Sequence, residues 1–102
     1  MSNEFLIYQT FNCNIPKTNV PFTQMQTLIK NIDALDTHHK STMVQLIIEH
    51  ARLNDDLPTD LQVPPYNGTC KDNSIDFVLN DIPNPLKWIL LRYVTMVMEK
   101  SQ

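Results

Sequence analysis

The sequence NPLKWILLRYVTMV at residues 84–97 decides the fold, because it predicts a long helix that is apolar on most of its sides. Asn84 is a good N-cap, and Pro85 fits the first helical position, where its missing N–H costs nothing. One stripe at helical spacing predicts the core side: Leu86, Ile89, Leu90, Tyr93, Val94 and Val97. Other apolar residues lie partly off this stripe: Trp88, Leu91, Met96 and Met98. Such a helix is either central in a bundle or presents a binding surface.

Two further helices are predicted upstream. The first begins near Thr23, whose capping box Gln26 would complete, and it runs to about residue 35. Its apolar residues recur at helical spacing: Met25, Leu28, Ile29, Ile32 and Leu35. The second helix covers residues 38–53, with Thr37 as its N-cap. It carries two adjacent apolar stripes, so we expect it to pack on two neighbours: Met43, Leu46, Ile47 and His50 in one, and Val44, Ile48 and Ala51 in the other.

Short strands are predicted on either side of these two helices. Residues 5–11 alternate and are rich in aromatic and β-branched side chains, and residues 74–79 (SIDFVL) also alternate. The intervening residues 54–74 contain three Pro and the only Gly, Gly68, which we expect to supply a positive φ in a turn. The predicted fold is mainly α: a three-helix bundle with one or two short β-strands. An N-terminal extended arm at residues 1–21 would precede a helical domain at residues 22–102.

Composition limits the classes of function. The chain has 102 residues, enough for one core, and its single Gly excludes a glycine-rich phosphate loop. The net charge of −3 argues against direct nucleic-acid binding. No apolar run approaches the roughly 20 residues that cross a bilayer. No basic residue precedes the short N-terminal apolar patch, so this patch does not have the pattern of a secretory signal. We therefore expect no membrane association and a nuclear or cytoplasmic protein, not a secreted one. Cys13 and Cys70 could form one disulfide, but free thiols fit such a compartment better.

No catalytic or metal-binding motif stands out in the sequence. His38 and His39 are neighbours on a predicted helix and do not face each other, so they cannot easily chelate one metal. His50 has no Cys or carboxylate at ligand spacing, and the carboxylates of residues 54–81 lack a calcium-loop pattern. The sequence therefore predicts no enzyme, no catalytic residue, no metal and no cofactor.

Acidic residues are concentrated between residues 54 and 81. This segment has six aspartates and one lysine, a net charge of −5. A solvated loop would account for these charges, and so would an acidic rim beside the strand at residues 74–79. Asp76 lies within that strand and favours the second interpretation, because carboxylates on one face and apolar side chains on the other suit a Lys-rich extended peptide. Charge complementarity would then add rate and selectivity more than affinity.

Three stretches of the chain resemble the extra-terminal (NET) domain of the BET bromodomain family of transcription regulators. Residues 28–35 are similar to the leucine–isoleucine–leucine pattern of the family's first helix, and residues 43–48 to its paired valine and paired isoleucine run. The third stretch is the most specific: Ile75-Asp76-Phe77, then Ile82, Leu86 and Leu90, and finally Arg92-Tyr93-Val94. The match spans residues 22–100.

The resemblance implies a strand between the second and third helices that pairs with short peptides in which Lys and apolar residues alternate. Its partner would be a basic, nuclear chromatin or transcription regulator, and a free-standing copy suggests a small adaptor, for example a viral mimic. The candidate peptide-binding residues are Asp72, Asp76, Ile75, Phe77, Val44, Ile47 and Ile48. Ser74 and Asn73 replace an acid and an isoleucine of the family's strand, and Lys40 replaces a leucine, which should weaken or alter selection for basic peptides.

Two other classes of function stay open beside the peptide-binding module. The chain could be a structural subunit that forms a homodimer or larger homo-oligomer through its apolar last helix. A small enzyme is the third class, and a deep pocket with a perturbed titratable group would reveal it. Within the peptide-binding interpretation, residues 5–11 could themselves add to the strand at residues 74–79 and occupy the peptide site, because an open strand edge is usually covered.

Overall fold

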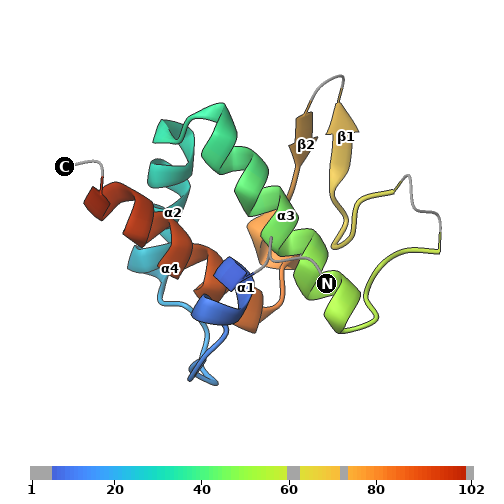
Figure 1. The fold of residues 1–102 in the computed structure, drawn as a ribbon, viewed down its shortest axis with the longest axis horizontal. Helices are drawn as coiled ribbons and strands as arrows, with labels where there is room; N and C mark the ends of the chain where they lie inside the picture. Colours follow the sequence, from blue (N-terminus) through green and yellow to red (C-terminus); the bar gives the residue numbers. More distant parts are fainter. Residues whose placement is uncertain (1–5, 60–62, 72–73, 101–102) are drawn as a thin grey trace.

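The computed structural model describes residues 6–59, 63–71 and 74–100 (Figure 1). Its element order is α1 (Leu6–Phe11), α2 (Phe22–Ala34), α3 (Thr37–Leu53), β1 (Thr69–Lys71), β2 (Ser74–Asp76), the short 3₁₀ helix η2 (Leu79–Asp81) and α4 (Asn84–Lys100). The described residues are therefore mainly helical, as predicted, with one small antiparallel sheet.

Helix α4 lies at the centre of the bundle. It contacts α1, α2 and α3, which surround it in Figure 1. All six residues of its predicted core stripe are buried, and each large one contributes about 1.5–3 kcal/mol by leaving water. The predicted off-stripe residues are half-buried, and three of them pack against the same core: Leu91, Met96 and Met98. The prediction of which side of this helix is buried is confirmed.

The three long helices begin slightly earlier than predicted. Pro21 is the N-cap of α2 and makes no side-chain cap hydrogen bond, so Thr23 lies inside the helix and caps nothing. Asp36, not Thr37, caps α3: its carboxylate accepts a hydrogen bond of 2.9 Å from the His39 N–H. That backbone hydrogen bond favours the ionised carboxyl and lowers the pKa of Asp36.

The first turn of α4 also differs from the prediction by one residue. The Lys87 N–H donates to the Pro83 carbonyl over 3.0 Å, and Asn84 is already helical. Pro85 therefore takes the second helical position instead of the first. It is tolerated there for the same reason, because the first four N–H groups of a helix have no intrahelical acceptor.

The prediction of an N-terminal strand at residues 5–11 is wrong. Residue 5 lies outside the described residues, and Leu6–Phe11 form α1, which packs against α3 and α4. Tyr8 is only 2% exposed, and its hydroxyl lies 2.7 Å from Nδ1 of His50 on α3. These core contacts override the local β-propensity, which depends strongly on context. A helix docked here cannot be the strand that covers the edge of β2, so that hypothesis also fails.

Two side chains of α4 hold the segment that follows α1. The guanidinium of Arg92 donates to three backbone carbonyls at and just after the end of α1, those of Phe11 (2.9 Å), Cys13 (2.6 Å) and Asn14 (3.2 Å). The Trp88 indole N–H donates to the Thr18 carbonyl over 2.8 Å. The N-terminal segment is thus fixed along α4, and Val20 at its end is buried.

The sheet is a hairpin of two short strands. β1 and β2 pair antiparallel, with Thr69 opposite Asp76, Cys70 opposite Ile75 and Lys71 opposite Ser74. β1 was not expected from the sequence. The predicted strand at residues 74–79 is shorter in the structure, because it ends at Asp76 and η2 begins at Leu79.

Gly68 serves the hairpin differently from the prediction. The left-handed backbone belongs to Tyr66 (φ 56°) and Asn67 (φ 59°), and Gly68 has no positive φ. What requires glycine is close packing: a Cβ atom at residue 68 would lie 2.7 Å from Cε1 of Phe77 and 2.8 Å from Cβ of Pro64. The absence of a side chain therefore lets the Phe77 ring lie directly on the backbone that leads into β1.

Candidate functional site

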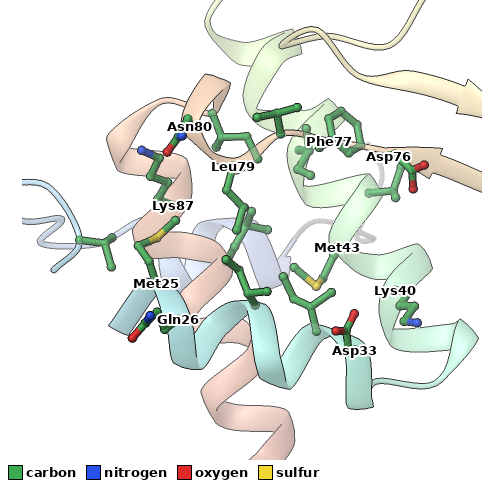
Figure 2. A pocket seen from close by; sticks show the side chains of 18 of the residues that line it. Met25, Gln26, Asp33, Lys40, Met43, Asp76, Phe77, Leu79, Asn80 and Lys87 are labelled. Carbon is green, nitrogen blue, oxygen red and sulfur yellow. The ribbon is translucent and has the colours of Figure 1, made fainter. Parts of the chain in front are cut away.

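An open groove of about 1680 Å³ lies between α2, α3 and the segment that follows β2 (Figure 2). Its apolar lining comes from three directions: Met25, Ile29 and Ile32 of α2; Met43, Val44 and Ile47 of α3; Phe77, Val78, Leu79 and Ile82 after β2. Amphipathic helices normally close such a gap with one another. Here, Ile29 of α2 is exposed and Val44 of α3 is half-buried beside the groove, whereas Met43, Ile47 and Ile82 are buried.

Three apolar side chains that line the groove are largely exposed. Phe22 is 74% exposed, Val78 is 54% exposed and Ile29 is 49% exposed. Scattered exposed apolar residues need no explanation, but a group of them around one concavity is typical of a protein or peptide interaction site. The helical stripe of α2 predicted Ile29 to be buried, so this exposure is a departure from the sequence-based expectation.

The strand β2 leads directly into the groove. Asp76, its last residue, and Phe77 are both part of the lining, and Figure 1 shows β2 on the α3 side of the hairpin. Two residues separate the strands in the sequence. In such hairpins the pair next to the connection, here Lys71 and Ser74, is hydrogen-bonded, and the following pair, here Cys70 and Ile75, is not. We therefore expect the N–H and C=O of Ile75 to point away from β1. In the part of the chain that the structure describes, no third strand pairs with β2.

The two ends of the groove differ in charge. Figure 2 shows Asp33, Lys40 and Asp76 at one end, which gives this end a net charge of −1. At the opposite end lie Asn80 of η2 and Lys87 of α4. The charge count of residues 54–81 suggested an acidic rim. The groove also has Lys40 and Lys87 in its lining, so it is not lined by acids alone.

The structure brings most of the described candidate residues together. Val44, Ile47, Asp76 and Phe77 all line the groove. Ile48 does not, because α3 lines the groove only as far as Ile47, and the Ile48 side chain is 38% exposed outside it. Asp72 and the side chain of Ile75 lie outside the described part of the structure.

Several lining residues were not singled out from the sequence. Asn80 and Lys87 line the groove but belong to no motif, and Asp33 lies in the stretch at residues 28–35 without having been counted among the candidate binding residues. One signal could have found Lys87: it is the lysine that interrupts the apolar start of α4, directly after a core residue. No signal in the sequence distinguishes Asn80 from other loop residues.

The histidines of α3 serve packing in the described structure. The Nδ1 atom of His39 lies 2.8 Å from the Tyr93 hydroxyl, and His50 pairs with Tyr8 in the same way. Burial lowers the pKa of His50, which favours the neutral imidazole beside the Tyr8 hydroxyl. Neither histidine lines the groove.

Among the described residues, no three His, Cys, Asp or Glu side chains gather closely enough to hold a metal ion. In the same residues, every helix is too short or too polar to cross a bilayer. No family model, no curated protein and no solved structure matches this chain.

Proposed function

We propose that this chain is a non-enzymatic peptide-binding module. An extended segment of a protein partner adds as a strand to the edge of β2 and places alternate apolar side chains in the groove. The observation that carries this proposal is the position of β2, whose last residue forms part of a groove with exposed apolar walls. Strand addition uses main-chain hydrogen bonds for affinity and side-chain pockets for specificity. A two-stranded hairpin is marginally stable on its own and gains from a third strand.

The apolar walls set the scale of the affinity. Complete burial of Phe22, Ile29 and Val78 from their present exposure would contribute about 3–5 kcal/mol. Association costs of about 4 kcal/mol or more offset this gain, so the partner's own side chains and backbone bonds supply the net affinity. A micromolar dissociation constant, about −8 kcal/mol, would suit a reversible adaptor, and nearly all of it would have to come from those partner side chains and backbone bonds.

The chemistry of the partner follows from the groove and from the sequence resemblance. Apolar residues at alternate positions fit a strand with one face toward the groove, and a lysine fits the end that holds Asp33 and Asp76. The resemblance to the extra-terminal domain supports the same kind of partner, a Lys-bearing segment of a chromatin or transcription regulator. The core stripe of α4 is buried inside the same chain, which leaves half-buried residues such as Trp88 and Leu91 for contact with a second copy and weakens the case for a homo-oligomer formed through that helix.

A peptide selection tests this proposal. Random 12-residue peptides displayed on phage would be selected on the immobilised chain, and the selected peptides measured against two variants with the same chemical change. Ile29→Arg places a cation in the groove, whereas Ile48→Arg places it on the part of α3 outside the groove. We expect Ile29→Arg to weaken binding at least tenfold and Ile48→Arg to leave it unchanged. Failure to select any peptide, or equal effects of the two variants, would contradict the proposal.

A second variant tests the role of Asp76. Asp76→Lys reverses the charge of an exposed residue at the end of β2, so the fold should persist. We expect it to abolish binding of Lys-containing selected peptides. Calorimetry that gave the same affinity for both proteins would remove Asp76 from the site.

A further inference from the structure

We propose that the segment bound in this groove is bipolar, with a carboxylate side chain at its N-terminal end beside Lys87 and a basic side chain about four residues later beside Asp33 and Asp76. This inference rests on the proposed function and adds the charge pattern and the direction of the bound segment. The partner segment that fits has five residues in this order: acidic, apolar, any, apolar, basic.

The first step is the environment of Lys87. Its side chain is half-buried, and Figure 2 shows it at the same end of the groove as Asn80. Among the described residues, no carboxylate forms an ion pair with Lys87. Because no described carboxylate pairs with Lys87, an added carboxylate would form a charge-assisted hydrogen bond with its ammonium. The end of the groove that holds Lys87 and Asn80 therefore favours an anionic group.

The second step is the contrast with the opposite end. Asp33 and Asp76 approach the groove from α2 and β2, and Lys40 of α3 balances one of their charges. The net negative charge there favours a cation. A uniformly basic peptide would satisfy this end but would place a like charge beside Lys87, and such a juxtaposition discriminates against wrong partners.

The third step is the spacing. The chain passes from Asp76 along residues 77 and 78 to η2, where Asn80 lies. At roughly 3.3 Å per extended residue and 2 Å per 3₁₀ residue, this path is about 12 Å long, which an extended partner spans in about four residues. Residues four apart in a strand lie on the same face, so the charged residues at the first and fifth positions can both face the rim. The apolar residues at the second and fourth positions then face the groove.

The last step is the direction. β2 runs toward the Lys87 end, since residues 77–82 lead from its last residue to the start of α4. Antiparallel pairs outnumber parallel pairs two- to threefold and are slightly more stable. An antiparallel partner would start at Lys87 and end at Asp76, which puts the acidic residue first in its sequence.

Two synthetic peptides with the same composition test this inference. Both have acetylated and amidated ends, so that side-chain carboxylates alone can pair with Lys87. One carries the core glutamate, isoleucine, threonine, isoleucine, lysine, and the other exchanges the glutamate and the lysine. Flanking Gly-Ser pairs and a fluorophore allow measurement by anisotropy. We expect the glutamate-first peptide to bind about five- to tenfold more tightly at low salt, with the difference shrinking as salt screens it.

Charge reversal of Lys87 links that preference to this residue. Lys87→Glu should reduce or invert the preference, whereas Lys30→Glu, the same change on an exposed α2 residue outside the groove, should leave it intact. Equal affinity of the two peptides, tighter binding of the lysine-first peptide, or an undiminished preference in Lys87→Glu would overturn the inference while leaving the peptide-binding module standing. If neither these peptides nor any selected peptide binds, the proposed function fails and the inference fails with it.

Discussion

Gly68→Ala tests whether the hairpin holds Phe77 in place at the groove. The added methyl group would lie 2.7 Å and 3.0 Å from two ring atoms of Phe77 and 2.8 Å from Cβ of Pro64. Carbon atoms prefer about 3.5–4.0 Å, so the ring must move by roughly 1 Å. Overpacking of this kind costs about 1–3 kcal/mol. Because Gly68 has no positive φ, alanine also gains about 0.4–1 kcal/mol by restricting the unfolded chain.

The overpacking term is the larger one, so we expect Gly68→Ala to lower the free energy of unfolding by about 1–2 kcal/mol. Urea denaturation measures this change, and the affinity for a selected peptide should fall with it, because Phe77 lines the groove. Phe77→Leu shortens the side chain at the point of contact, so the alanine substitution should cost less in that background. If Gly68→Ala stabilises the protein, or if its effect is the same with Phe77 and with Leu, the ring does not lie where this reasoning needs it.

Two further predictions concern the N-terminal segment. Arg92→Ala removes the donors of three hydrogen bonds to carbonyls at the end of α1 and should lower the free energy of unfolding by about 2 kcal/mol. Amide exchange should become faster in residues 6–14 alone. Faster exchange throughout the bundle, or no change, would contradict the role of Arg92 in holding this segment. Burial lowers the pKa of His50 below the 6.5 of an unfolded chain, so its contribution to stability is complete above pH 6.5 and is lost as the pH falls through the folded pKa. His50→Gln should flatten the unfolding free energy between pH 6.5 and 5, and an unchanged pH profile would refute the assignment.

The helices were predictable because their sequence pattern and their packing agree. The stripe of Leu86, Ile89 and Leu90 has helical spacing over a long run, and all three residues are buried. The short N-terminal run failed because alternation over six or seven residues is a weak signal, and Tyr8 gains more from the core beside His50 than from a strand edge. β1 gave no strand pattern of its own: its three residues are fixed by pairing with β2.

The candidate site was predicted only in part, for a related reason. Val44 and Phe77 could be placed from their patterns, since helix and strand periodicity tell which residues share a face. Periodicity does not tell where a face meets a neighbour and where it stays open. That is why Ile29 was expected in the core and is half exposed, and why Ile48 was expected in the groove and lies outside it.

The helical N-terminus also changes how the groove can be regulated. An arm paired with β2 would have blocked strand addition, whereas α1 is fixed against α3 and α4 by Arg92 and Tyr8. None of the described residues between Leu6 and Thr18 lines the groove. Removal of this segment should therefore weaken the bundle without raising peptide affinity.

Backbone hydrogen exchange at Ile75 is the most direct test of strand addition to β2. A partner strand would take the N–H of Ile75 as a donor, so binding of the glutamate-first peptide should slow exchange of this amide by a factor of up to 1 + [peptide]/Kd, about a hundredfold at a free peptide concentration of about 100 Kd. Amides of α4 serve as the internal reference. If the peptide binds in the groove while the Ile75 amide exchanges at its unliganded rate, the partner does not extend the sheet.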